Sequence, residues 1–172
     1  MDILIRQLET QDIETIAAAF QLLGWNKPVT QYERYYAQQL QGKRTVLVAF
    51  LNNEFVGYLT ICWQSEYPPF RQANIPEIKD FNVLPTFRRQ GIGTQLMGEA
   101  ERMITQRSAI VGIGVGLYVD YGAAQRLYVK RGYIPDGKGL VSHDRFVKPG
   151  DQVAVDDDLV LYLTKNTAAD SI

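Results

Sequence analysis

RRQGIGTQL, residues 88–96, places two arginines and two glycines directly before a segment with helical periodicity. Ile92, Leu96 and Ala100 recur at the spacing of one helix face. The preceding stretch EIKDFNVL, residues 77–84, is typical of a strand, and a proline ends it. This part of the chain is therefore predicted to form a strand, a short loop and a long amphipathic helix.

Length and composition bound the architecture. The chain has 172 residues, of which 46% are hydrophobic, so it is long enough to bury a core of its own. We expect one domain over residues 1–165 and a polar, frayed tail over residues 166–172. The net charge of −1 argues against a general nucleic-acid partner, which would favour a basic excess. No apolar run approaches the ~18 residues that a membrane span needs, so no membrane association is expected.

Cysteine content and the first residues bear on the compartment. Cys62 is the only cysteine, which excludes an internal disulfide and a cysteine-based metal site and favours a reducing environment. Residues 1–4 lack the basic and apolar regions with which a signal peptide begins. We therefore expect a cytoplasmic protein.

Strand and helix patterns alternate along the chain. Helices between strands indicate an α/β or α+β domain, and a hairpin signal at Asn52-Asn53 makes the sheet mixed. Residues 65–76, rich in turn formers, are predicted to be an exposed loop, and a long segment, residues 136–157, separates the last two strands. The expected elements are strands over 3–8, 77–84, 110–119 and 157–164, a hairpin over 45–63, and helices over 13–20, 28–40, 92–104 and 122–131.

The glycine loop can bind an anion. The first turn of a helix has unpaired backbone N–H groups and partial positive charge, which suit a pyrophosphate. Gly91 and Gly93 would let phosphate oxygens approach the backbone, and Arg88 and Arg89 would add fixed charge. The alternative is an ordinary helix start with two solvated arginines. A Walker loop is excluded because no Lys-Ser or Lys-Thr follows, and Leu96 stands where a dinucleotide fold would want its third glycine.

The predicted strand VGIGVGLYV, residues 111–119, has Gly112, Gly114 and Gly116 on one face, followed by Tyr118. Its other face is apolar and predicted to be core. Glycine weakens a strand, so something is expected to lie flat against the bare face. A ligand and a tightly packed helix are both compatible with this pattern.

The loop and a later helix resemble those of the Gcn5-related N-acetyltransferase (GNAT) family. The family's phosphate loop, Q/R-x-x-G-x-G/A, is matched by residues 88–93, and its tyrosine helix by Ala124, Tyr128, Gly132 and Tyr133. The resemblance covers most of residues 2–164. It implies a GNAT-like fold, with a mostly antiparallel, mixed central sheet whose strands splay apart and which is flanked by helices.

The resemblance implies transfer of an acetyl group from acetyl-CoA to an amine, without a metal or nicotinamide cofactor. The pyrophosphate would lie on the amides of residues 89–94, and the pantetheine arm would pair with backbone near Phe81 and Val83. Tyr121 stands where the family often has a cofactor-contacting asparagine, which puts that contact in doubt. The implied cofactor-binding residues are Phe81, Val83, Arg88, Arg89, Gln90, Gly91, Ile92, Gly93, Thr94 and Tyr121.

Two residues are candidates for acid–base chemistry. Tyr128 occupies the family's usual general-acid position and would protonate the leaving thiolate, although a tyrosine at helical spacing is also a common core residue. Glu77 is a candidate general base for the amine, and the alternative is an exposed residue at the start of a strand. Asp80 is ranked lower because strand alternation would point it to the opposite face. His143, the only histidine, lies in a late loop that either reaches the opening between the splayed strands or is simply solvated.

The acceptor is identified only as an amine of a small molecule or protein. Carboxylates in and directly after residues 136–157, which are Asp136, Asp144 and the run 156–158 among others, would suit a cationic acceptor, or they form a solvated acidic turn. Trp25 and residues 66–70 are further candidates for flanking it.

Other functions remain open from the sequence. The chain is also compatible with a non-catalytic acyl-CoA sensor or interaction module. A toxin that acetylates charged tRNA would need a basic surface, which the net charge does not favour. The resemblance makes a homodimer possible.

Overall fold

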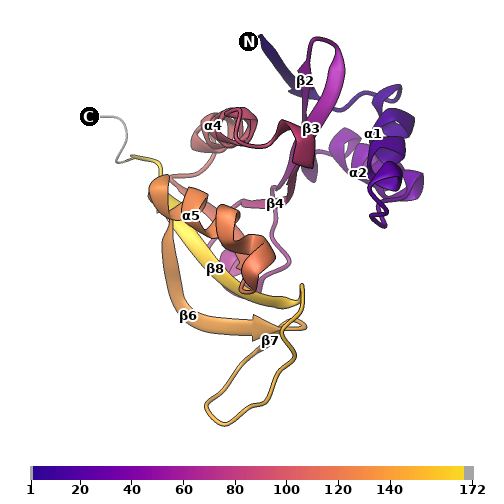
Figure 1. The fold of residues 1–172 in the computed structure, drawn as a ribbon. Helices are drawn as coiled ribbons and strands as arrows, with labels where there is room; N and C mark the ends of the chain where they lie inside the picture. Colours follow the sequence, from indigo (N-terminus) through magenta and orange to yellow (C-terminus); the bar gives the residue numbers. More distant parts are fainter. Residues whose placement is uncertain (1, 169–172) are drawn as a thin grey trace. The chain divides into compact units, whose positions relative to one another are not determined.

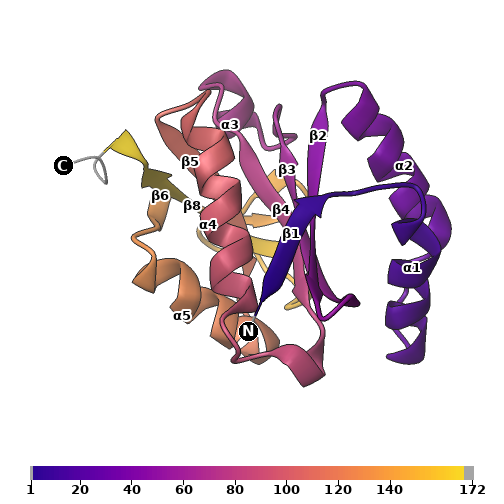
Figure 2. The ribbon, with the colours of Figure 1, turned by 90° about the horizontal axis from the view of Figure 1, so that it is seen from above.

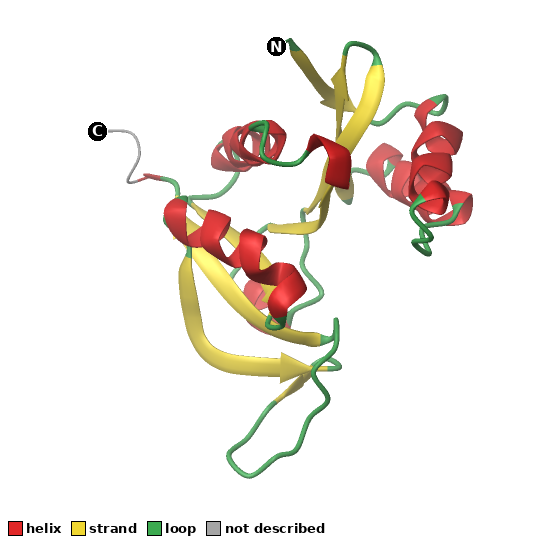
Figure 3. Cartoon of the chain, viewed as in Figure 1, coloured by secondary structure: helices red, strands yellow, loops and turns green. Residues whose placement is uncertain are grey.

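The computed structural model describes residues 2–168, and their fold is a mixed α/β fold with mostly antiparallel strands (Figures 1 and 3). The chain forms two compact units. The first combines Met1–Trp63 with Ile78–Arg102, and the second combines Gln64–Glu77 with Met103–Ile172. Among the described residues, none of the helices has the length and apolar character needed to cross a membrane.

The strands of the first unit follow one another in the order β1-β2-β3-β4. β1 and β2 pair antiparallel, as do β2 and β3, and the predicted hairpin is confirmed, with Asn52 and Asn53 in left-handed conformation at its turn. β4 is hydrogen-bonded to β3, and just after β4 the N–H of Leu84 donates to the carbonyl of Val56. The strands are β1 (Ile3–Gln7), β2 (Arg44–Leu51), β3 (Glu54–Cys62) and β4 (Glu77–Val83).

Helices cover both faces of these strands. Two of them, α1 (Asp12–Leu22) and α2 (Val29–Leu40), lie on one face, and α4 (Ile92–Thr105) lies on the other (Figure 2). A short 3-10 helix, η1 (Pro85–Phe87), leads from β4 towards α4. The helices predicted over residues 13–20, 28–40 and 92–104 are therefore confirmed. The apolar residues at helical spacing in α1 and α4 are buried, whereas Val29 and Leu40 at the two ends of α2 are exposed.

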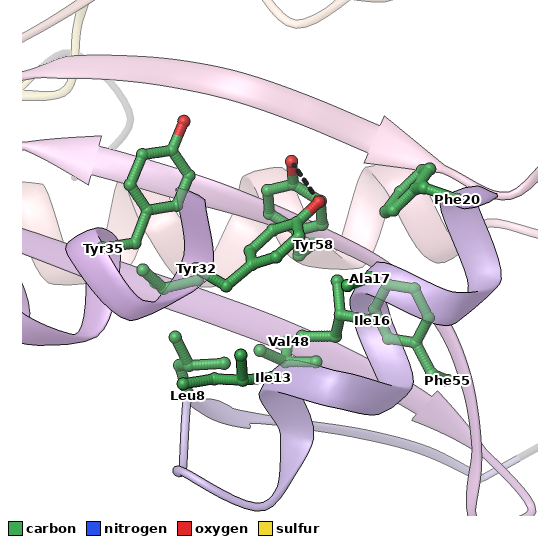
Figure 4. Close-up of a cluster of buried hydrophobic side chains, with 11 residues drawn as sticks. Leu8, Ile13, Ile16, Ala17, Phe20, Tyr32, Tyr35, Val48, Phe55 and Tyr58 are labelled. Atoms are coloured by element: carbon green, nitrogen blue, oxygen red, sulfur yellow. Dashed lines mark hydrogen bonds between the residues drawn. The ribbon is translucent and has the colours of Figure 1, made fainter. Parts of the chain in front are cut away.

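The core between α1, α2 and the strands is rich in aromatic rings (Figure 4). The ring of Phe20 contacts the rings of Phe55 and Tyr58, and the Tyr32 hydroxyl donates to the Tyr58 hydroxyl over 3.3 Å. Tyrosines bring polar atoms into this apolar cluster, so each hydroxyl needs a partner. The buried members are Leu8, Ile13, Ile16, Ala17, Phe20, Tyr32, Tyr35, Val46, Val48, Phe55 and Tyr58.

The second unit has strands in the order β5-β8-β6-β7, and all of these neighbours pair antiparallel. Its longest register joins β5 to β8, where Gly114 is opposite Tyr162. The elements are α3 (Pro68–Gln72), β5 (Ile110–Gly116), η2 (Val119–Tyr121), α5 (Gly122–Lys130), β6 (Ile134–Ser142), β7 (Arg145–Phe146) and β8 (Leu159–Asn166).

Two sequence predictions about loops are wrong. Residues 65–76 are not an exposed loop, because α3 forms within them and the side chains of Tyr67 and Phe70 are buried. Residues 136–157 do not separate the last two strands, because most of β6 and all of β7 lie there. The sequence hid β6 because its pairing with β8 shifts register between Pro135 and Leu140, which interrupts the alternation. A loop over residues 147–158 remains (Figure 3).

The first residues of the predicted tail, 166–168, are tied to the fold rather than frayed. β8 continues to Asn166, and the N–H of Thr167 donates to the carbonyl of Ala109 over 2.8 Å. The side chain of Thr167 is buried. Of the predicted frayed tail, residues 169–172 lie outside the described residues. The prediction of one domain over residues 1–165 stays a prediction.

The bare glycine face of β5 is filled by side chains of the second unit. A Cβ at Gly112 would overlap the ring of Phe70, and a Cβ at Gly116 would overlap the ring of Tyr121. At Gly114 a Cβ would come within 2.9 Å of the side chain of Val160. Packing by side chains of α3, β8 and η2 therefore accounts for the three glycines, so neither a ligand nor one tightly packed helix is needed.

We expect Gly112→Ala to lower the free energy of unfolding by about 1–3 kcal/mol, because the added methyl group overpacks against the Phe70 ring. Urea unfolding followed by circular dichroism measures this change. Phe70→Leu combined with Gly112→Ala provides the control, since the smaller side chain leaves room for the methyl group. Equal losses from Gly112→Ala in the wild-type and Phe70→Leu backgrounds would contradict the packing explanation.

Candidate functional site

The loop between β4 and α4 has the geometry of an anion-binding cradle. Arg89 and Gly91 adopt left-handed backbone conformations, with φ of 64° and 81°. A Cβ at Gly91 would have no atom within 4 Å, so the space in front of this residue is open. The N–H of Gln95 donates to the carbonyl of Gly91, which leaves the N–H groups of Ile92 and Gly93 without acceptors inside the helix. The residues present therefore fit a phosphate group.

The two glycines of the loop have different roles. Gly91 provides the left-handed backbone and the open space. Gly93 lies in the first turn of α4, and a Cβ there would come within 3.0 Å of the ring of Phe81. The sequence assigned both glycines to close approach by phosphate. The structure gives Gly93 a second reason, because Phe81 of β4 packs beneath the start of the helix.

The polar side chains of the loop are unevenly engaged. Arg88 Nε donates to the carbonyl of Val83 over 3.1 Å, so this arginine ties the loop to the end of β4. Gln90 Nε2 lies 3.4 Å from the carbonyl oxygen of Thr86. The guanidinium of Arg89 is exposed and has no hydrogen-bond partner within residues 2–168. Of the two arginines, Arg89 is therefore the one available to an incoming anion. Ile92 is buried beneath the loop, and Thr94 is exposed on the next turn.

Tyr128 lies on α5 in the second unit. Its side chain is only 5% exposed, and its ring contacts the ring of Tyr133 at 6.1 Å between centroids. Burial raises the pKa of the Tyr128 hydroxyl well above its ordinary value, so this group stays protonated at neutral pH. The hydroxyl makes no hydrogen bond within residues 2–168, where no fully buried polar side-chain atom lacks a partner. The ring is therefore core, while the hydroxyl reaches the surface.

Glu77 is buried, with 3% of its surface exposed, so its interpretation as an exposed strand-start residue is wrong. The hydroxyl of Ser65 donates to Glu77 Oε2 over 2.6 Å, and the N–H of Tyr67 donates to the Ser65 hydroxyl. The sequence does not point to Ser65, because the composition of residues 65–76 predicts an exposed loop. A carboxylate held in this way has a fixed orientation, as a general base requires.

Tyr121 follows β5 and belongs to a small polar cluster. The hydroxyls of Tyr121 and Tyr118 both donate to the carboxylate of Asp157, the former over 2.8 Å. These hydrogen bonds lower the pKa of Asp157 below its ordinary value. The ring of Tyr121 also covers Gly116. Tyr121 therefore has a packing role within the second unit, and its cofactor contact stays a prediction.

His143 and the acidic run lie together at the turn after β6. His143 Nε2 is 3.3 Å from a carboxylate oxygen of Asp158 and 3.7 Å from one of Asp156. All three side chains keep much of their surface exposed. The acidic run is thus partly engaged by the only histidine, as expected of a solvated acidic turn, and the role of these residues towards an acceptor stays a prediction.

Asp80 has a network of hydrogen bonds and an ion pair that the sequence does not reveal. It lies in β4 with φ of 54°, so the regular alternation expected over residues 77–84 is wrong, and Glu77 and Ile78 are both buried. Burial opposes ionisation, but the charge of Lys27 and several hydrogen bonds outweigh it and hold the pKa of Asp80 below its ordinary value. The carboxylate accepts hydrogen bonds from Tyr58 (2.5 Å), Lys27 (2.7 Å), Asn82 (2.8 Å), Tyr35 (3.0 Å) and Gln31 (3.2 Å).

Comparison with known protein families matches residues 10–133 to the acetyltransferase (GNAT) family. A search of curated proteins found no match. Several solved structures share the fold. The PaiA N-acetyltransferase of Thermoplasma acidophilum, in complex with coenzyme A, is 15% identical, with 96% of this chain and 99% of that chain covered and a TM-score of 0.65.

Two further structures have similar scores. YncA of Salmonella typhimurium, with its cofactor acetyl-CoA, is 18% identical, with 96% and 94% of the two chains covered and a TM-score of 0.68. A chimera of the spermidine N-acetyltransferase SpeG from Vibrio cholerae and hSSAT is 13% identical, with 98% of each chain covered and a TM-score of 0.71. At these identities the structures establish the fold alone.

Proposed function

Because this chain belongs to the acetyltransferase (GNAT) family, we propose that it transfers an acetyl group from acetyl-CoA directly to a primary amine of a small molecule or protein. Bound acetyl-CoA supplies the activated acyl group as a thioester. Two of the similar structures are named as N-acetyltransferases, one of them for spermidine, which supports nitrogen as the acceptor atom. Cytoplasmic location and a homodimer stay predictions.

The observation that carries this proposal is the open loop before α4. The N–H groups of Ile92 and Gly93 have no acceptor inside the helix, and the positive end of the helix dipole favours an anion in front of them. Gly91 leaves that space open, and the exposed Arg89 adds a fixed positive charge. We assign the pyrophosphate of acetyl-CoA to this loop, with Gln90 and Thr94 at its edge.

Other loop residues are assigned to support. Arg88 bonds the carbonyl of Val83, so it fixes the loop against β4 rather than adding charge in front of Gly91. The ring of Phe81 packs against Gly93 and so supports the first turn of α4. The backbone of Phe81 and Val83 is proposed to pair with the pantetheine arm, with Phe81 the better placed because the Val83 carbonyl already accepts a hydrogen bond.

Tyr128 is proposed as the general acid. A thiolate leaving group needs a proton, and the Tyr128 phenol, which is protonated at neutral pH, carries one. The Tyr128 hydroxyl makes no hydrogen bond within residues 2–168, so no described group of this chain competes for its proton. Glu77 is proposed as the general base. Its carboxylate is buried and oriented by Ser65, and an amine must lose a proton before it attacks.

Release of free thiol from acetyl-CoA tests the proposed activity. We expect the wild-type protein to release coenzyme A when a library of primary amines is supplied, measured with a thiol reagent and by mass spectrometry of the acetylated amine. A folded protein that binds acetyl-CoA in calorimetry but acetylates none of the amines would support the non-catalytic sensor instead. A protein that does not bind acetyl-CoA would overturn the proposal altogether.

The same assay includes Glu77→Gln as an arm. The amide keeps the size of the side chain and can still accept the Ser65 hydrogen bond, but it cannot accept the proton of the amine. We expect kcat/KM at neutral pH to fall by about 100-fold, with acetyl-CoA affinity unchanged. Ser65→Ala provides a control that removes the orienting hydroxyl but keeps the carboxylate. A Glu77→Gln protein of wild-type rate would exclude Glu77 as the base.

A further inference from the structure

In the first unit, the ammonium group of Lys27 lies in a cage of side chains that belong to the same unit. Lys27 Nζ lies 2.7 Å from Asp80 Oδ1, and each of the two side chains keeps 18% of its surface exposed. Lys27 belongs to the short connection between α1 and α2, while Asp80 is 53 residues away in β4. The pair therefore joins a loop to the strand that also carries Phe81 and Val83.

Aromatic rings complete the cage around the ammonium group. Lys27 Nζ is 5.6 Å from the ring centre of Phe20 and 5.7 Å from that of Tyr58, both within the range of a cation–π interaction. The same ammonium is 3.2 Å from the Tyr58 hydroxyl. A carboxylate, a hydroxyl and aromatic faces are the groups that recognise alkylammonium ligands. Phe20, Tyr58 and Asp80 thus form a cation site, here called the Asp80 cage.

The cage is built independently of Lys27. The Asp80 carboxylate also accepts hydrogen bonds from Tyr35 and Tyr58, and the hydroxyls of both tyrosines are drawn on the same side of the core in Figure 4. Arg44 lies over the ring of Tyr35, with its guanidinium carbon 4.2 Å from the ring centre, and this contact helps to fix the ring. Removal of Lys27 would therefore leave an oriented, hydrogen-bonded anion rather than a collapsed gap.

The arrangement is costly if its only role is structural. Partly buried ion pairs lose much of their Coulomb attraction to desolvation, and an apolar pair of similar size is often as stable. Asp80 also adopts a left-handed backbone conformation, which is uncommon for a residue that is not glycine, although aspartate tolerates it better than most side chains do. The counter-ion comes from a loop, where a lysine side chain can turn outwards without disturbing a helix or strand.

We propose that the Asp80 cage is a binding site for an ammonium group of the acceptor, and that Lys27 occupies this site until the acceptor displaces it. This inference rests on the proposed amine acetylation. An ammonium held by an ionised carboxylate keeps its proton and cannot attack a thioester. The nitrogen in the cage is therefore not the one that reacts, and the acceptor carries at least two amino groups. Short alkyl diamines and polyamines have this chemistry.

Binding of 1,4-diaminobutane without acetyl-CoA tests the inference apart from catalysis. We expect NMR titration to give a Kd about tenfold or more lower for Lys27→Met than for the wild-type protein, because the tethered competitor is gone. Asp80→Asn is expected to abolish the binding. Lys43→Met, which removes an exposed lysine of the same unit, is the matched control and should keep the wild-type Kd. n-Butanol, which lacks the charge, should not bind to any of the variants.

The outcomes separate this inference from the proposed function. Equal Kd values for the wild-type, Lys27→Met and Lys43→Met proteins would overturn the displacement of Lys27, whether or not acetyl-CoA is turned over. Binding that survives Asp80→Asn would exclude the cage as the site. If Lys27→Met does not fold, Lys27→Gln retains a neutral donor for Asp80 and is expected to show the same gain in affinity.

Discussion

Gly91→Glu is expected to reduce the affinity for acetyl-CoA by at least about 100-fold, because it places a carboxylate in the space proposed for the pyrophosphate. The structure gives this substitution room, since a Cβ at Gly91 has no atom within 4 Å. The left-handed backbone, with φ of 81°, adds a strain of about 1–2 kcal/mol to the folded state. Isothermal titration calorimetry measures the affinity, and circular dichroism establishes that the variant is folded.

Gly42→Glu is the matched control for this experiment. Gly42 follows α2, has φ of 72°, and also has no atom within 4 Å of a built Cβ. The control therefore introduces the same charge and nearly the same backbone strain at a position with no proposed contact to acetyl-CoA. If both variants lose affinity equally, the loss reflects strain or net charge and not the loop. Full affinity in Gly91→Glu would show that the loop does not hold the pyrophosphate.

Tyr128→Phe is expected to lower kcat by about 10²–10⁴-fold, the usual contribution of a general acid, with little change in acetyl-CoA affinity. The change in stability should be small, because the hydroxyl makes no hydrogen bond within the described residues and the ring contact with Tyr133 remains. Steady-state kinetics and calorimetry on the same preparation separate the two effects. This separation distinguishes an acid from a core tyrosine.

The pH dependence gives a second test of the same residue. Burial raises the pKa of Tyr128, so the neutral, proton-donating form persists to higher pH than for an exposed tyrosine, whose pKa is about 10. The wild-type rate should therefore not decline through loss of this proton below pH of about 10. Tyr118→Phe, which removes a hydroxyl that hydrogen-bonds Asp157, is the comparison variant for the kcat of Tyr128→Phe. A Tyr128→Phe protein with wild-type kcat would remove this residue from the mechanism.

The sequence identified the elements that depend on local patterns. A glycine turn between a strand and an amphipathic helix is encoded within residues 77–104, and neighbouring residues suffice to form it. The hairpin at Asn52-Asn53 is local in the same way, because asparagine tolerates the left-handed conformation that the turn requires. The GNAT resemblance likewise rested on two short motifs, and the family match over residues 10–133 agrees with it.

The sequence was less informative where residues far apart in the chain meet. Residues 65–76 have the composition of a loop, yet Phe70 is buried because it fills the space that Gly112 leaves. The composition of such a segment does not reveal the residues, distant in sequence, against which it packs. The same holds for Glu77, whose burial depends on packing that a strand pattern does not reveal.

By itself, the sequence indicated the family, the glycine loop and the helix that carries Tyr128, because each depends on short-range spacing. Only the tertiary structure separated the roles of Gly91 and Gly93, since one faces open space and the other faces the ring of Phe81. Only the tertiary structure brought Lys27 to Asp80. Such a charge pair forms only when the loop packs against the strand that carries the partner. Partial burial then strengthens the attraction between the two groups, which solvent would otherwise screen.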